Sequence, residues 1–288
     1  MNANWILNTD ESIYHLKLRQ EHVAENIITV GDPERVPMIS NYFDTIEFKI
    51  SSREFVTHTG FFKNKRITVI STGIGTDNVE IVLNEIDALF NVNFLTGQDM
   101  SPLKSLNIIR LGTSGAIQEE IPVDTLLISN AAIGVDALMD FYVSKNQAEE
   151  SEILKHFMAN GIQVNSLYYI KVDESLLTHF KDTNIMNGLT LTTPGFYAPQ
   201  GRTVRIKSHQ NQLLSKLSKL DLNPFGKIAN IEMETAGIYA LATLMGHRSI
   251  SLNAILANRI TNEFSSNPEK TIRKLIEYCL EKIVLLEQ

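Results

Sequence analysis

Short apolar runs rich in β-branched and aromatic residues recur along the chain, and many are followed by segments whose apolar residues repeat at helical spacing. The apolar runs predict strands at residues 26–31, 45–51, 55–59, 66–72, 106–112, 125–131, 163–171, 227–232 and 249–257. The helical spacing predicts helices near residues 34–42, 78–90, 150–160, 209–219, 233–245 and 268–287. This alternation predicts a single α/β domain over residues 1–288, a three-layer α/β/α sandwich around a mixed, largely parallel central sheet.

The last of these helices has the clearest pattern. Asn267 stands at the capping position and Pro268 at the first helical position, while apolar residues from Ile272 to Ile283 follow one face. Cys279 falls on that face. We therefore expect it to pack in the core rather than to act as a nucleophile.

Composition narrows the classes of partner. The chain has 288 residues, a formal net charge of −7 and no apolar run of the roughly 18 residues that cross a bilayer, so we expect neither nucleic acid nor a membrane as partner. The N-terminal residues lack the basic and apolar stretches of a secretory signal, and Cys279 is the only cysteine, so we expect a cytoplasmic protein. The histidines are scattered without ligand spacing, so no metal site is predicted.

Residues 228–237 place two carboxylates two positions apart among apolar or small neighbours. The stretch has the pattern of a strand that runs directly into a helix, so Glu232 and Glu234 do not belong to a solvated charge run. A carboxylate at the end of a buried strand needs a hydroxyl, an amide or a cation as partner. The sequence leaves two interpretations open, a ligand-binding glutamate and a glutamate that caps the helix or satisfies the core.

Arginines stand beside glycines at the ends of two predicted strands. Gly31 begins a turn and Arg35 follows where the next helix starts, so an anion could meet a backbone N–H and a guanidinium there, although a turn with a surface arginine is the alternative. Arg110 interrupts the apolar run 106–111, where an always-charged side chain needs an anionic partner. Thr113 adds a hydroxyl at the same strand end, so the two segments together indicate a phosphate site.

Residues 196–202 combine an aromatic face, a carboxamide and a guanidinium, from Phe196, Gln200 and Arg202. Such a set suits a planar ring with carbonyl and N–H groups along its edge, although an ordinary surface loop can have the same composition. Residues 71–75 lack the third glycine of a dinucleotide fingerprint, and neither a Walker-type sequence nor a serine-hydrolase elbow occurs. NAD and ATP are therefore not expected.

Residues 30–32, 110–115, 231–234 and 256–259 each end a predicted strand. Parallel sheets bind ligands beyond the carboxyl ends of their strands, so we expect the candidate segments to share one crevice. In this order they resemble the nucleoside phosphorylase family, and within it the uridine phosphorylase branch. The segments that carry the resemblance are residues 15–18, 30–35, 51–55, 71–75, 110–116, 196–202, 232–234 and 257–259. The resemblance implies a pentosyltransferase that reversibly converts uridine and phosphate to uracil and ribose 1-phosphate, with phosphate as co-substrate and no organic cofactor.

The resemblance also implies a role for individual residues. Phosphate would be bound by Gly31, Arg35, Arg110, Thr113 and, from a neighbouring subunit, Arg53. Ribose would contact Thr113, Met233, Glu234 and the neighbour's His15, and the base would contact Phe196, Gln200 and Arg202. Catalysis would rest on Arg202, Gln200, Glu234 and Arg110, because donors aimed at the base carbonyls lower the barrier where negative charge develops.

Alternatives remain at the level of substrate and assembly. Purine phosphorylases of this family carry an aspartate in a Ser-Asp-His motif where this chain has Ala257-Asn258-Arg259, so a purine nucleoside phosphorylase is the second choice. A nucleosidase that uses water is the third, and the set of arginines argues against it. A nucleoside-binding protein without activity is the alternative that is not an enzyme. The implied assembly is a homo-oligomer, either a dimer or a hexamer built as a trimer of dimers. Residues 75–78 differ from the family's Gly-Gly-Pro-Ser, so a monovalent cation at the subunit interface is not carried over. Residues 93–105 read as an insertion, and Ala198-Pro199 replaces the usual Pro-Gly.

Overall fold

The computed structural model describes residues 7–143, 147–210 and 212–286. Within these residues one mixed sheet of 11 strands runs in the order β13-β12-β8-β10-β11-β7-β1-β4-β3-β2, with β9 paired to β8. Its strands are β1 (Asn26–Val30), β2 (Thr45–Ser52), β3 (Phe55–Phe62), β4 (Lys65–Ser71), β7 (Asn107–Ala116), β8 (Leu126–Gly134), β9 (Tyr168–Lys171), β10 (Met186–Thr192), β11 (Ile228–Glu232), β12 (Arg248–Asn258) and β13 (Glu263–Phe264). A separate hairpin joins β5 (Val92–Asn93) and β6 (Gln98–Asp99), which lie at and within the segment predicted as an insertion.

Parallel pairing occupies the centre of the sheet. Strand β1 lies parallel to β4 and β7, β7 is parallel to β12, and β10 is parallel to β8 and β11. Two antiparallel pairings, β12 with β8 and β11 with β7, close β7, β12, β8, β10 and β11 into a ring. Beyond β4 the sheet continues with antiparallel β3 and β2, and β2 forms an open edge.

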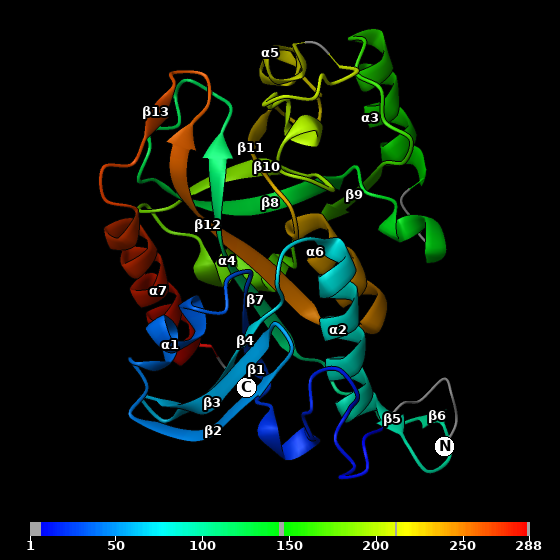
Figure 1. The fold of residues 1–288 in the computed structure, drawn as a ribbon, viewed down its shortest axis with the longest axis vertical. Helices are drawn as coiled ribbons and strands as arrows, with labels where there is room; N and C mark the ends of the chain where they lie inside the picture. Colours follow the sequence, from blue (N-terminus) through cyan, green and yellow to red (C-terminus); the bar gives the residue numbers. More distant parts are fainter. Residues whose placement is uncertain (1–6, 144–146, 211, 287–288) are drawn as a thin grey trace.

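Helices cover both sides of the sheet, which confirms the predicted α/β architecture. Figure 1 shows α1 and α7 on one side and α2 and α6 on the other. Helix α1 packs on β3 and β4, α7 packs on β7 and β12, and α6 packs on β8, β10 and β12 and against α2. The α-helices are α1 (Arg35–Ser40), α2 (Thr76–Asn91), α3 (Gln147–Ala159), α4 (Glu174–Phe180), α5 (Leu213–Lys219), α6 (Thr235–Met245) and α7 (Pro268–Val284), joined by 3-10 turns at η1 (Gln20–His22), η2 (Leu138–Phe141) and η3 (Ala198–Gln200).

Several elements were not predicted, and the two that bear most on the architecture are strand β10 and helix α4. Strand β10 lies at the centre of the ring, yet its Asn187-Gly188 pair has the composition of a turn. Glycine is needed there, because a Cβ on Gly188 would lie 2.4 Å from the Cβ of Ala229 on β11. Helix α4 follows the N-cap Asp173, whose side chain accepts a hydrogen bond from the Leu176 N–H at 2.9 Å.

Several predicted boundaries shift. Strand β9 begins at Tyr168 rather than at residue 163, and α5 begins at Leu213 rather than at 209. Strand β7 continues to Ala116, because Gly115 and Ala116 pair with β11. The cap of α7 is as predicted, with the Asn267 side chain accepting from the Lys270 N–H at 3.1 Å. Cys279 is fully buried on that helix, and burial raises the pKa of its thiol, as expected for an inert core cysteine.

Candidate active site

A cavity of about 610 Å³ opens where β1, β7, β11 and β12 end. The lining includes all but two of the residues predicted for the site, and they come from four separated stretches of the chain. They are Gly31, Arg35, Arg110, Thr113, Phe196, Gln200, Arg202, Met233 and Glu234. The predicted convergence at the carboxyl ends of the strands is therefore confirmed.

Arg35 and Arg110 line the cavity close enough to each other to interact electrostatically, and such a pair suits an anion. Arg35 is the first residue of α1, and its Nη1 donates to the carbonyl of Leu111 on β7 at 3.2 Å. Burial lowers the pKa of this guanidinium, and the nearby Arg110 lowers it further while Asp32 offsets part of the effect. Two cations brought together in a low-dielectric pocket favour an anion between them.

Arg110 is a buried residue in the wall of the cavity. Its Nη2 lies 2.9 Å from Glu232 Oε2 and 2.6 Å from Glu234 Oε2, and its Nη1 donates to Asn253 Oδ1 at 3.1 Å. Burial alone would lower the pKa of Arg110, but the two carboxylates outweigh it and raise the pKa. Gly112 makes room for the guanidinium, since a Cβ at that position would lie 1.8 Å from Arg110 Nη1.

Both glutamates line the cavity, and their carboxylates make different further contacts. Glu232 binds the free amides at the start of α6, accepting from Glu234 N at 2.9 Å and from Thr235 N at 2.9 Å. Glu234 lines the cavity, and its Oε1 accepts from the Gly75 N–H at 2.8 Å. Burial raises the pKa of Glu234, and Glu232 adds to the rise while Arg110 opposes it.

A second group of lining residues, Phe196, Gln200 and Arg202, presents hydrogen-bonding groups beside an aromatic ring. Gln200 is 3% exposed, and its Nε2 donates to Thr193 Oγ1 at 3.1 Å while its Oε1 accepts from Arg202 Nη1. The Arg202 guanidinium stacks 3.7 Å from the centre of the Phe196 ring, and burial lowers its pKa. The set is therefore held in place before any ligand binds.

Sequence reasoning assigned no role to several residues that support this site. Arg259 donates to the Gln200 carbonyl at 2.7 Å, and its pKa falls to about 10 because of burial and the neighbouring Arg202. An arginine at the end of the apolar strand β12 was the available signal, of the kind that singled out Arg110. Thr192, the last residue of β10, and Thr193, which follows it, were not predicted as supporting residues because β10 itself was not predicted. Phe264 on β13 also lines the cavity.

His15 and Arg53 lie outside the cavity of their own chain. They flank Tyr14, whose ring centre lies 4.8 Å from that of His15 and 5.6 Å from Arg53 Cζ. His15 Nδ1 contacts Glu85 Oε1 on α2 at 2.5 Å, while Arg53 is exposed on the turn between β2 and β3. The two residues thus form one surface cluster rather than two separate sites.

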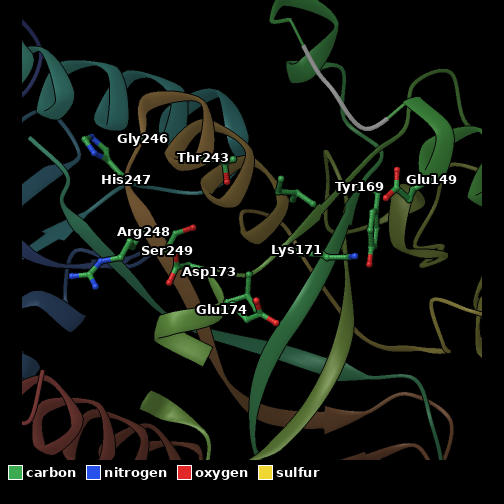
Figure 2. A pocket seen from close by; sticks show the side chains of 12 residues that line it. Glu149, Tyr169, Lys171, Asp173, Glu174, Thr243, Gly246, His247, Arg248 and Ser249 are labelled. Atoms are coloured by element: carbon green, nitrogen blue, oxygen red, sulfur yellow. The ribbon is translucent and has the colours of Figure 1, made fainter. Parts of the chain in front are cut away.

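Another cavity, of about 540 Å³, lies far from these groups, where β12 begins and β9 ends (Figure 2). Its lining includes Tyr169, Asp173, His247 and Arg248 and contains none of the predicted site residues. Parallel sheets rarely bind substrates at the amino ends of their strands, so the cavity around Arg110 is the better candidate.

The residues that the structure describes include no group of three or more His, Cys, Asp or Glu side chains that could hold a metal ion. No helix that the structure describes is long and apolar enough to cross a membrane.

Comparison with known proteins places this arrangement in context. Residues 25–283 match the family model described as the phosphorylase superfamily. The chain is similar to the uridine phosphorylase of Thermococcus kodakarensis, with 32% identity over 91% of this chain and 83% of the relative. It is 27% identical to a DeoD-type purine nucleoside phosphorylase of Listeria monocytogenes, over 94% of this chain and 98% of the relative. A solved Trypanosoma brucei nucleoside phosphorylase described as showing uridine phosphorylase activity superposes with a TM-score of 0.88 and 28% identity, over 98% of this chain and 100% of that one.

Proposed function

The chain belongs to the phosphorylase superfamily, and on that premise we propose that it is a uridine phosphorylase, a pentosyltransferase that reversibly converts uridine and phosphate to uracil and ribose 1-phosphate. The observation that carries the proposal is that one cavity is lined both by Arg35 with Arg110 and by Gln200 with Arg202. The first pair suits a phosphate. The second pair suits the carbonyl and N–H edge of uracil.

In the proposed reaction a phosphate oxygen attacks C1′ of the ribose as the bond from C1′ to the base nitrogen breaks, and the bonding electrons leave with uracil. Arg35, Arg110, Thr113 and the Gly31 backbone would hold the phosphate. Arg202 and Gln200 would donate to the base carbonyls as negative charge develops on them. Glu234 would accept hydrogen bonds from the ribose hydroxyls, and Met233 would pack on the sugar.

The similarity to a purine nucleoside phosphorylase makes purine nucleosides the second candidate substrates. One observation argues against them. Asn258 stands where purine phosphorylases of the family are expected to carry an aspartate, yet it is 1% exposed and its Nδ2 donates to the Gln118 and Ile121 carbonyls at 2.9 Å each. A side chain committed to the backbone in this way is not free to meet a purine ring.

The proposed assembly is a homo-oligomer whose smallest active unit is a dimer, in which His15 and Arg53 of one subunit complete the site of the next. Their clustering around Tyr14, away from their own cavity, supports this arrangement. We place the reaction in the cytoplasm, where a chain whose only cysteine is the buried Cys279 meets the usual reducing conditions.

The test is base release from uridine, thymidine, inosine and adenosine, each measured with and without phosphate. We expect turnover of uridine that depends on phosphate and yields ribose 1-phosphate. Equal release without phosphate would indicate a hydrolase, faster turnover of inosine or adenosine would indicate the purine branch, and binding of nucleoside without turnover would indicate a protein that has lost the activity.

A further inference from the structure

Two adjacent buried threonines lie where β10 ends, Thr192 as its last residue and Thr193 directly after it, and neither contributes to the lining of the cavity. Resting on the proposed function, we propose that they are positioning residues that divide the site between them. Thr192 would hold the phosphate- and ribose-binding groups through Glu232, and Thr193 would hold the base-binding carboxamide of Gln200.

The hydrogen bonds of Thr192 can be assigned without ambiguity. Its Oγ1 accepts from the Ala236 N–H at 2.9 Å, and a backbone N–H can only donate. The single hydroxyl hydrogen is therefore free for Glu232 Oε1, which lies 2.5 Å away. This is a short hydrogen bond to a carboxylate, the class that contributes most to orientation.

Glu232 passes this constraint to the groups that would meet substrate. While Thr192 fixes Oε1, Oε2 contacts Arg110 Nη2 at 2.9 Å and accepts from the Glu234 N–H at 2.9 Å. One carboxylate thus sets the guanidinium and also the backbone from which the Glu234 side chain extends. Without the Thr192 hydroxyl, Oε1 would keep only the longer contact to Thr235 N at 3.1 Å, so the carboxylate would be held mainly through Oε2 and its orientation would be less well fixed.

Thr193 contacts Gln200, one of the residues proposed to bind the base. Gln200 Nε2 donates to Thr193 Oγ1 at 3.1 Å, and the Thr193 hydroxyl can pass its own hydrogen to the Gly195 carbonyl at 3.1 Å. This contact and the one from Arg202 to Gln200 Oε1 fix which end of the carboxamide donates and which accepts. The order matters, because a base edge with the wrong sequence of donors and acceptors leaves polar groups unpaired.

The division follows from the geometry of a strand end. Successive side chains of a strand point to opposite sides, so the hydroxyls of adjacent residues can serve different neighbours. The Thr192 hydroxyl contacts the Glu232 carboxylate on β11 and the start of α6. The Thr193 hydroxyl contacts Gly195 and Gln200 in the segment that leads into η3, and it lies 3.4 Å from the Glu232 backbone carbonyl rather than near the carboxylate. One strand end therefore sets the relative placement of the two substrates.

The test compares Thr192→Val and Thr193→Val in the full chain, each paired with a serine variant that keeps the hydroxyl. Calorimetry measures binding of inorganic phosphate and of uracil, and steady-state kinetics measures kcat and KM. Thr59→Val is the matched control, since Thr59 is also 0% exposed and loses hydrogen bonds to His22 O and to Thr68 on the far part of the sheet.

We expect Thr192→Val to weaken phosphate binding and lower kcat/KM on the order of 10- to 100-fold, the effect of a lost hydrogen bond to a charged group, while uracil affinity holds. Thr193→Val should do the reverse and weaken uracil about 2- to 10-fold, because its hydrogen bond is neutral. Serine should restore each loss. Thr59→Val should lower the unfolding temperature without changing either affinity.

Two contrary outcomes are distinguishable. If wild-type protein neither binds uracil nor turns over uridine, the proposed function itself is wrong. If wild-type protein does both, but the two valine variants weaken both ligands equally or leave both unchanged, the division between Thr192 and Thr193 is overturned and the proposed function stands.

Discussion

The Arg202 guanidinium is the charged donor best placed to act on a leaving base, since it lies beside Gln200 and over the Phe196 ring. We expect Arg202→Ala to lower kcat for uridine on the order of 100- to 1000-fold, the usual effect of deleting one preorganised donor to a developing anion. Gln200→Ala should cost less, because a neutral hydrogen bond contributes roughly 0.5–1.5 kcal/mol. Steady-state kinetics with uridine measures both.

Phosphate binding provides the control for that experiment. Arg202 contacts Phe196 and Gln200, whereas Arg35 contacts Leu111 and lies near Arg110. The loss of Arg202 should therefore leave phosphate affinity within about twofold of wild type by the additivity of independent sites. Near wild-type kcat in Arg202→Ala would remove this residue from the proposed mechanism. Undiminished inosine cleavage by the same variant would point to the purine branch.

The raised pKa of Glu234 leads to a prediction for how kcat/KM changes at acid pH. Its pKa is raised, first by burial and then by Glu232, above the ordinary glutamate value of 4.5. Ribose hydroxyls can donate to both oxygens of this carboxylate only when it is ionised, so kcat/KM for uridine should fall as the pH drops through the raised pKa.

The profile of Glu234→Gln separates this effect from the titration of phosphate itself. The amide does not ionise, so the variant should have a lower plateau and should lose the limb that belongs to Glu234. If the acid limb is the same in both proteins, Glu234 is not the group that titrates.

The sequence predicted those site residues whose charge is unusual among apolar neighbours. Arg110 stood out because a guanidinium inside an apolar strand demands a partner, and the structure supplies Glu232 and Glu234. The sequence could not show which glutamate accepts hydrogen bonds from the N–H groups at the start of α6, since that depends on where α6 begins. Thr192 and Thr193 gave no signal, because threonine is an ordinary strand residue.

At the scale of elements, Gly188 is the point where β10 meets β11. A Cβ there would overlap that of Ala229 at 2.4 Å, so Gly188→Ala should force the two strands apart and lower the free energy of unfolding by about 1–3 kcal/mol. Urea denaturation measures the loss.

A compensating change on the facing strand tests that explanation. Ala229→Gly makes room for the new methyl group, so the double variant should regain part of the stability that Gly188→Ala loses. A double variant no more stable than the sum of the two single effects would mean that the close approach of β10 and β11 is not the cause.

The elements that were predicted are those with a long, regular pattern, such as α7 and the apolar strands β1 and β12. The elements that were missed are short or carry a residue required by packing rather than by propensity. Gly188 disguised β10 as a turn, and α4 has only 7 residues. The closure of β7 to β11 and of β12 to β8 depends on contacts between distant segments, which no local pattern records.

At the scale of the whole molecule, the cluster of His15, Tyr14 and Arg53 predicts active sites shared between subunits. Arg53→Ala should damage a partner's site, whereas Arg35→Ala should damage its own. Each variant alone should be weakly active. Unfolding the two together in equal amounts and refolding them should restore about a quarter of wild-type activity, because half of randomly paired dimers are mixed and each contains one intact site.

The outcome can be checked by comparing the mixture with each variant refolded alone at the same total concentration. Activity of the mixture equal to the mean of the two would contradict shared sites. A fully active monomer, identified by light scattering during the assay, would do so as well.

The ring formed by β7, β12, β8, β10 and β11 determines which strands of the sheet can open locally. A strand with neighbours on both sides cannot peel away alone, whereas β2 has a neighbour only on one side. Amide hydrogens on β10 and on β7 beneath Arg110 should therefore exchange with deuterated solvent only through global unfolding, while those along β2 exchange through local fraying. Arg53, on the turn that follows β2, would then sit on the looser half of the protein, so the contact offered to a partner would tighten on assembly while the cavity it completes stays rigid.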